Sequence, residues 1–406
     1  RDPEMSRGLG DVYKRQMNRY ITLAIACFAV VPMQAQTIDD VLRQVEQNNK
    51  ELQAQAQATL ASKLEVQAEN NLEDPSVEYS PFYTRGITGM SSSELVVTQG
   101  FDFPTLYGAR RKSGKVKQEA LDRRYQAVRR DILLQAKNLC LDLIMLRQKQ
   151  ALLDERAKNA DELLALFEKR LQEGDAGILE VNKIKMERMS VQTETAQTSA
   201  AHRTALQGLL ALNGNLPFTF DADTYPRMEE PNDANALYDE VMATDAALLE
   251  ADANARAAEQ ELKVNRQSWL PKLEVGYRRN TSLDEKSNGF LVGGSFPLFS
   301  NRKKTRIARA QAVSARLAAD DARLKAESEV HSRFNEMCRL REAMEAYDVT
   351  LMHRTLALLH EAVRAGQLSV IEFYTEADNV YRNLQAYIEL ENQYQKLMAE
   401  IYKNRL

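Results

Sequence analysis

The sequence contains few of the residues that mark enzymes, metal proteins or disulfide-rich domains. It has 3 cysteines and 4 histidines in 406 residues. Beyond residue 35 only Cys140 and Cys338 remain, and two distant thiols define no disulfide framework, so we expect them to pack in helices like small apolar residues. The histidines show no metal-binding spacing, and no G-x-S-x-G elbow or phosphate-binding loop occurs. The sequence therefore predicts no enzyme activity, no cofactor and no bound metal.

An excess of positive charge and long apolar runs are also missing. The formal net charge is −4, and a mildly acidic chain is a poor candidate for binding nucleic acid. After residue 35 no run of eighteen apolar residues occurs, so we expect no membrane-spanning helix there. Any insertion into a membrane would have to use strands.

The N-terminal region has the features of an export signal. Residues 1–16 show no periodicity and precede Met17, so we interpret them as a non-native or read-through segment. Residues 17–35 combine a basic start, a short apolar run and a small residue before Gln36, which is typical of a secretory signal peptide. Cys27 is also compatible with lipid attachment, but the apolar run continues past it, which favours ordinary cleavage.

Four landmarks recur in the same order at nearly constant spacing. The pairs and their separations are Leu52 and Leu248 (196 residues), Pro75 and Pro271 (196), Pro104 and Pro297 (193), and Gly174 and Gly366 (192). The small losses in spacing fit loops, which tolerate changes in length. We therefore predict a tandem duplication, with a first repeat at 36–213, a proline-rich linker at 214–233 and a second repeat at 234–406.

Each repeat is predicted to begin with one helix of about 35 residues, at 37–72 and 234–268, because these segments are rich in Ala, Leu, Glu, Gln and Lys. Two strands, a very long helix, a glycine turn and a last helix follow. The long helix carries a seam with steps of three or four, typical of a coiled coil. The seam residues are Tyr125, Val128, Ile132, Ala136, Leu139, Leu143, Leu146, Gln150, Leu153, Ala157, Ala160, Leu164, Phe167 and Leu171. We expect the returning helix after the glycine turn to be its partner.

The strands alternate apolar and polar residues over about ten positions. The four segments are PSVEYSPFY, SELVVTQGFDF, KLEVGYRRN and FLVGGSFPLF. In the third, Leu273, Val275 and Tyr277 share one face, whereas Lys272 and Glu274 lie on the other. An ordinary soluble sheet with one wet face has the same pattern, but the export signal and the duplicated rods favour transmembrane hairpins.

The number of strands has a consequence for assembly. A membrane barrel needs about eight strands or more and leaves no edge open to lipid. Each chain offers four predicted strands. One chain therefore cannot close a pore, and we expect two or three copies to share one.

Duplicated hairpins, long antiparallel rods and glycine turns together resemble the TolC-type outer-membrane efflux protein family. The short motifs that carry the resemblance are the F-P turns at Phe103-Pro104 and Phe296-Pro297 and the turns R-L-Q-E-G (170–174) and R-A-G (364–366). The resemblance covers residues 37–406. It implies a mainly α fold with a small β part, in which three chains share a twelve-stranded transmembrane barrel. Their antiparallel coiled-coil helices would continue this barrel as a periplasmic α-barrel.

The same resemblance implies a function and a set of partners. The chain would form a homotrimeric exit duct in the outer membrane of a Gram-negative bacterium. The duct would passively conduct substrates delivered by an inner-membrane efflux pump and a periplasmic adaptor protein. The tip turns expected to contact the adaptor contain Gly174, Asp175, Gly177, Arg364, Gly366 and Gln367.

The resemblance also implies a constriction where acidic residues follow the second tip turn. Glu372 lies where the family often has Asp, whereas Thr375 replaces another common Asp and has Glu376 beside it. Glu180, after the first turn, is a further candidate. Glu180 and Glu187 are also explained as exposed coiled-coil charges, and that interpretation stays open.

Basic residues follow both F-P turns, where we expect the proline to end the strand and begin the long helix. The two clusters are Arg110, Arg111 and Lys112, continuing to Lys115, and Arg302, Lys303 and Lys304, continuing to Arg306. If these residues begin helices, their charges oppose the helix dipole, so another interaction must favour them. We expect that interaction to be with anionic headgroups of the outer-membrane lipid; a solvated basic patch is the alternative.

Two rival functions remain open at this point. A non-membrane periplasmic coiled-coil scaffold or adaptor would explain the rods without using the apolar strand faces. A component of a metal-ion exporter is compatible with the modest length, but no cluster of Met or His supports it.

Overall fold

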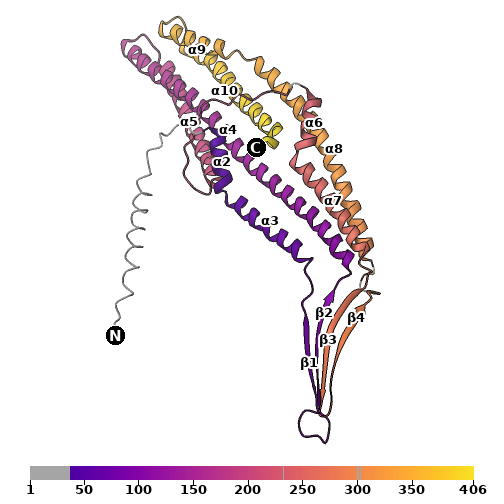
Figure 1. Cartoon of the computed structure of the whole chain (residues 1–406). Coiled ribbons are helices and arrows are strands. Elements are labelled where there is room, and N and C mark those ends of the chain that lie inside the picture. The colour runs from indigo at the N-terminus through magenta and orange to yellow at the C-terminus, as the bar shows by residue number, and fades with distance from the viewer. Residues whose placement is uncertain (1–36, 232, 300, 302) are drawn as a thin grey trace, which may run out of the picture.

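The computed structural model describes residues 37–406 except 232, 300 and 302. The predictions for 1–16, for the signal peptide at 17–35 and for Cys27 therefore lie outside the described residues. The chain is an elongated, mostly helical molecule with a small sheet at one end and two helical tips at the other (Figure 1). This confirms a mainly α fold with a small β part.

The two halves share one order of elements, except that the second half divides its long helix into α8 and α9 and ends in a 3₁₀ helix. The first half contains α2 (Ile38–Asn48), α3 (Lys50–Ala68), β1 (Ser76–Phe82), β2 (Ser92–Phe101), α4 (Pro104–Glu173) and α5 (Ile178–Leu212). The second half contains α6 (Ala234–Thr244), α7 (Ala246–Arg266), β3 (Lys272–Ser282), β4 (Lys286–Ser295), α8 (Lys304–Glu345), α9 (Val349–Arg364), α10 (Val370–Ile401) and the 3₁₀ helix η1 (Lys403–Arg405).

The strands form one antiparallel sheet in the order β1-β2-β3-β4. Each strand connects to one helix of a row in which α3, α4, α7 and α8 are successive neighbours (Figure 1). At the sheet end of the molecule, each of the four strands therefore has its own helix. Within the described residues, no helix has both the length and the apolarity needed to cross a membrane.

The first helix of each repeat is broken, contrary to the prediction of continuous helices at 37–72 and 234–268. Asn49 separates α2 from α3, and Asp245 separates α6 from α7. Each side chain accepts a backbone N–H of the following helix, and each residue has an extended backbone that interrupts the helical hydrogen bonds. A capping residue inside a helix-favouring composition thus divides one predicted helix into two.

The long helix is continuous only in the first repeat. α4 contains 70 residues and is therefore about 105 Å long. In the second repeat α8 ends at Glu345 and α9 begins at Val349, because Asp348 caps α9 by accepting the N–H of Leu351. The second repeat therefore departs from the predicted unbroken rod.

The two F-P turns also differ. Pro104 is the first residue of α4, as predicted, where its missing N–H removes no helical bond. Pro297 does not begin a helix, since α8 starts at Lys304. The prediction that both prolines begin the long helices is therefore correct only for the first repeat.

Apolar residues gather in three cores along the rod. One core joins α2, α4 and α5, a second lies near the tips among α4, α5, α9 and α10, and a third joins α6, α8 and α10. α4 packs along α5, which confirms the predicted coiled-coil partner. Seam residues such as Ala136, Leu143 and Leu153 are buried. Packing along one rod thus replaces a single globular core.

Asn49→Ala should loosen α3 selectively. Asn49 is 3% exposed; its Oδ1 accepts the N–H of Leu52 at 2.8 Å, and its Nδ2 donates to the Leu212 carbonyl at 2.9 Å. Loss of both bonds should cost about 2 kcal/mol of local stability. Hydrogen exchange of the amides in Lys50–Ala68 measures this cost. The exposed neighbour Lys50→Ala should leave exchange nearly unchanged, and equal effects of both variants would contradict the role of the cap.

Candidate functional site

The middle rungs of the sheet carry an apolar face, which Gln99 and Arg279 border on the same side. The register aligns Val77 with Val97, Val97 with Tyr277, and Tyr277 with Phe290 across all four strands. One rung nearer the helices, Val275 pairs with Val292. Phe290 and Val292 are 92% and 84% exposed in the single chain. Since pairing preserves the side on which residues point, the predicted alternation becomes a two-dimensional apolar surface.

The opposite face of the sheet is polar. Glu78 is aligned with Val96 and then with Arg278, and Glu94 is aligned with Asn280. Arg278 Nε lies 3.0 Å from Glu94 Oε1. A sheet with one apolar and one charged face suits a wall that separates lipid from water.

Both edges of the sheet are open in the single chain. β1 pairs only with β2, and β4 pairs only with β3, among the residues that the structure describes. Open edges next to an exposed apolar face are a template for pairing with another chain.

The first basic cluster does not begin its helix. α4 starts at Pro104, so Arg110, Arg111 and Lys112 lie beyond its first turn, where the helix dipole has little effect. Arg110 Nη1 instead donates to Asp102 Oδ2 at 2.6 Å, and Asp102 is buried. An intrachain ion pair therefore accounts for one of these cations.

The second basic cluster does lie at a helix start. Lys304 is the first residue of α8, and Lys303 precedes it with a left-handed backbone (φ 79°) and no side-chain cap. The described residues offer no ion-pair partner to either lysine. Arg302 lies outside the described residues.

The two tip turns have the same hydrogen-bond pattern. Gly174, at φ 84°, ends α4, with Asp175 N–H donating to the Arg170 carbonyl at 2.8 Å. Gly366, at φ 73°, follows α9, with Gln367 N–H donating to the Ala362 carbonyl at 2.9 Å. This six-residue closure requires a left-handed residue, which glycine adopts without strain. The predicted tip residues therefore lie in two equivalent turns.

A side chain joins the two tips to each other. Arg170 Nη2, at the end of α4, donates to the Arg364 carbonyl of α9 at 2.8 Å. Gly177 and Ser369 are the N-cap residues that directly precede the returning helices α5 and α10. The structure thus brings the predicted tip residues of both repeats to one end of the rod (Figure 1).

Glu180 and Glu372 occupy the same local position. Each is the third residue of its helix, and its carboxylate accepts the N–H of the residue before the helix, Gly177 at 2.9 Å and Ser369 at 3.0 Å. The Ser369 hydroxyl also donates to Glu372, and these bonds from the Ser369 side chain and backbone hold the pKa of Glu372 below its usual value. Both residues therefore stabilise helix starts.

The other predicted constriction residues share a face with Glu372. Glu372, Thr375 and Glu376 are exposed on α10, whereas Phe373 and Ala377 face the core. The Thr375 hydroxyl donates to the Ile371 carbonyl at 2.8 Å. The structure thus groups three of the four predicted residues on one helix surface and places Glu180 on α5.

Sequence reasoning missed an ion cluster centred on Arg156 of α4. Its guanidinium lies 2.6 Å from Glu187 and 3.3 Å from Glu194, both on α5, and 3.0 Å from Asp378 of α10. Burial lowers the pKa of Arg156, but Glu187 and the other two carboxylates outweigh this and raise it. One cation thus ties three helices together.

The interpretation of Glu187 as an exposed coiled-coil charge is wrong, because Glu187 is only 6% exposed. No sequence spacing reveals the cluster, since its members come from three helices that are far apart in the chain. Arg156 lies among other charged residues of α4, including Asp154, Glu155 and Lys158, and so gives no distinct signal of its own.

Arg156→Ala should destabilise the tip half of the molecule by about 3 to 5 kcal/mol, because it leaves Glu187 buried without its partner. Hydrogen exchange in α4, α5 and α10 measures the loss. Arg188→Ala is the matched control: it removes an exposed pair with Asp161, for which we expect less than about 1 kcal/mol. If the two variants behaved alike, the cluster would not have the role described.

Comparison with known proteins identifies related folds. Residues 237–403 match the family model described as outer membrane efflux protein. No curated protein sequence matches the chain at a significant level.

Solved structures share the fold over most of the chain. The CmeC outer membrane channel of Campylobacter jejuni is 14% identical, with 90% of this chain and 85% of that chain covered and a TM-score of 0.75. A membrane protein of Pseudomonas aeruginosa is 16% identical, with 90% and 93% covered and a TM-score of 0.75. The MtrE outer membrane channel of Neisseria gonorrhoeae, in its open state, is 12% identical, with 90% and 88% covered and a TM-score of 0.71. These likenesses confirm the predicted fold class.

Proposed function

Because its residues 237–403 belong to the outer membrane efflux protein family and its fold is that of the TolC-type channels, we propose that this chain is one subunit of an outer-membrane exit duct. The duct passively conducts substrates out of the cell. The observation that carries this proposal is an open-edged sheet with one apolar face, set on a long helical stalk.

The open edges support assembly from several copies. Four strands are too few for a membrane barrel, and unpaired backbone groups are costly in lipid. Pairing β4 of one copy with β1 of the next extends the ring, and three copies supply twelve strands. The apolar face then contacts lipid and the polar face lines the bore of the homotrimer.

The helices next to the open edges also carry unpartnered apolar residues. α3 precedes β1 and exposes Leu60 and Leu64, whereas α8 follows β4 and exposes Val313 and Leu317. These helices lie on opposite flanks of the four-helix row (Figure 1). When β4 pairs with β1 of the next copy, α8 comes to lie along α3 of that copy and the apolar residues face each other.

Charge supports the same pairing of helices. Arg309 and Arg316 of α8 make no ion pair within the described residues, and α3 carries Glu65 near its end at the sheet. Lys303 and Lys304 lie nearest the sheet, where anionic headgroups at the inner membrane surface would neutralise them. Arg111 and Lys112 extend the same level on α4, whereas Arg110 is satisfied within the chain.

The stalk and its tips suit the periplasmic part of the duct. The two tip turns are the surface proposed for the periplasmic adaptor, which connects the duct to an inner-membrane pump. The exposed face of α10 with Glu372, Thr375 and Glu376, together with Glu180 of α5, is the proposed constriction of the tunnel. A soluble scaffold is not favoured, because it would leave the whole apolar face of the sheet in water.

Val292→Arg should prevent assembly in the outer membrane, because a lipid-facing arginine costs about 2 to 4 kcal/mol near the bilayer midplane. Leu291→Arg is the matched control, since it changes the adjacent residue on the polar face. We expect trimers of Leu291→Arg, but not of Val292→Arg, in outer-membrane fractions run on gentle electrophoresis. Equal yields, or a soluble periplasmic monomer for the unchanged chain, would overturn the proposal.

Glu372→Gln should reduce the cation preference of the channel without unfolding α10, because glutamine also completes a capping box. The measurement is the reversal potential across a planar bilayer under a salt gradient, which should move towards zero. Glu372→Ala should lose both the charge and the cap. Glu342→Gln, an exposed charge on α8 far from the tips, is the control. An unchanged reversal potential in Glu372→Gln would remove Glu372 from the constriction and leave it a helix cap.

A further inference from the structure

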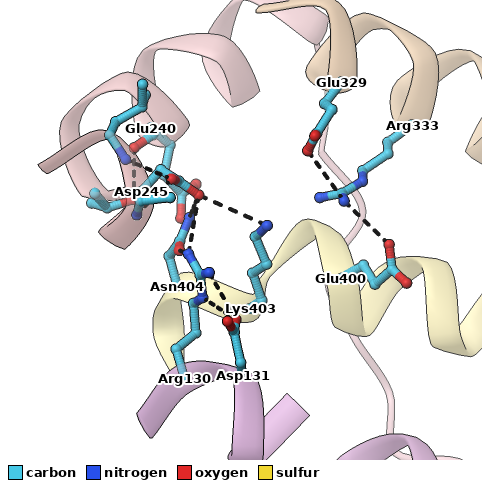
Figure 2. Close-up of polar contacts among 12 residues, drawn as sticks. Arg130, Asp131, Glu240, Asp245, Glu329, Arg333, Glu400, Lys403 and Asn404 are labelled. Atoms are coloured by element: carbon cyan, nitrogen blue, oxygen red, sulfur yellow. Dashed lines mark hydrogen bonds and ion pairs between the residues drawn. The ribbon is translucent and has the colours of Figure 1, made fainter. Parts of the chain in front are cut away.

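A cavity of about 210 Å³ lies where α6, α7, α8, α10 and η1 meet, midway along the rod. Leu237, Val241, Leu248, Val330 and Ile401 form an aliphatic wall. Figure 2 shows the charged residues of the same junction, with Asp245, Asn404 and Lys403 grouped near Arg130.

The carboxylate of Asp245 already accepts four hydrogen bonds from within the chain. Its Oδ1 accepts the N–H groups of Ala247 and Leu248, each at 3.0 Å. Its Oδ2 accepts Arg130 Nη1 at 3.4 Å and Asn404 Nδ2 at 3.3 Å. Asp245 therefore has little capacity left for a further cation.

Lys403 is that further cation. Its Nζ lies 3.9 Å from Asp245 Oδ2, beyond hydrogen-bonding distance, although its side chain is only 16% exposed. Among the described residues, no acceptor hydrogen-bonds to it. Burial, with the positive charges of Arg333 and Arg130, holds the pKa of Lys403 below its usual value, against the attraction of Asp245. A half-buried ammonium with unused donors thus borders an aliphatic cavity.

The other cations at the cavity have closer acidic partners than the 3.9 Å pair of Lys403 with Asp245. Arg333 Nη2 lies 3.3 Å from both Glu329 and Glu400 (Figure 2). Lys325 Nζ lies 2.7 Å from Asp321 and is exposed. Lys403 is therefore the cation best placed to receive an anionic group.

The duplicated architecture does not itself require these charges. In the first repeat, the junction of α2, α4 and α5 is a closed apolar core that contains Ile132, Leu133, Ala136 and Leu209. The second repeat has a cavity with a charged rim at the corresponding junction. The first-repeat junction also carries charge, in the ion pair of Arg129 with Glu46 at 2.6 Å, so the aliphatic cavity, and not charge, marks the second-repeat junction.

We propose that this cavity binds a small monocarboxylate with a short aliphatic tail. The carboxylate accepts hydrogen bonds from Lys403, and the tail lies against Leu237, Val241 and Ile401. A dianion is disfavoured, because Glu329 and Glu400 line the same rim. The site lies away from the sheet and the tip turns, so it does not depend on the proposed conduction of substrates.

The test is calorimetric titration of the purified full-length chain, in a nonionic detergent, with hexanoate, hexanol and hexylamine. Hexanoate should bind with one site per chain and at least about tenfold more tightly than either uncharged hexanol or cationic hexylamine. Lys403→Met should remove this preference. Ala326→Leu, which places a larger side chain in the cavity wall, should abolish binding. Lys325→Met, the matched control at the paired lysine, should bind like the unchanged chain.

If Lys403 only stabilised the fold, the melting temperature of Lys403→Met would reveal it. Removing an ammonium without a hydrogen-bond partner should leave the melting temperature of Lys403→Met equal or higher. The proposal is overturned if hexanol binds as tightly as hexanoate, if Lys403→Met keeps the preference, or if that variant melts at a clearly lower temperature. It is equally overturned if Ala326→Leu and the unchanged chain bind hexanoate alike.

Discussion

The unpaired edges of the four-stranded sheet constrain everything else in this molecule. Their backbone groups need partners, and the apolar face beside them needs an apolar surrounding. Both needs are met together only if other copies continue the sheet within a membrane. The apolar residues exposed on α3 and α8 then acquire partners from the same assembly step. Pairing of the open sheet edges thus also determines which surfaces of α3 and α8 contact a neighbouring copy.

The rod depends on a few polar residues placed between its apolar cores. Asn49 and Asp245 end one helix, begin the next and bond to distant parts of the chain. Arg156 joins α4, α5 and α10 near the tips through three carboxylates. Such contacts are specific in direction, and they act together with the interdigitated apolar side chains of the cores. The polar residues therefore join helices at particular points along the rod.

The features that could be predicted from the sequence are those marked by a regular spacing of residues or by a glycine. Alternation around Val275 gave the sheet face, steps of three and four gave the α4 seam, and the glycines gave the tip turns. The breaks at Asn49 and Asp348 were missed because residue composition favours helix there, although each residue caps the next helix through a local bond to the N–H three positions on. Arg156 was missed because its partners are distant in sequence. The tip and constriction residues came from resemblance, and they stay predictions because they concern partners and a bore that one chain does not contain.

The pairing of one helix with each strand has a further geometric consequence. Neighbouring strands lie about 4.8 Å apart, whereas packed helices lie about 8 to 10 Å apart. In the proposed ring, equal numbers of strands and helices must nevertheless enclose one continuous conduit. Strong tilting of the strands reconciles the two, because a tilted strand occupies more of the circumference. Strand inclination, rather than strand number, therefore matches the bore of the sheet to that of the stalk.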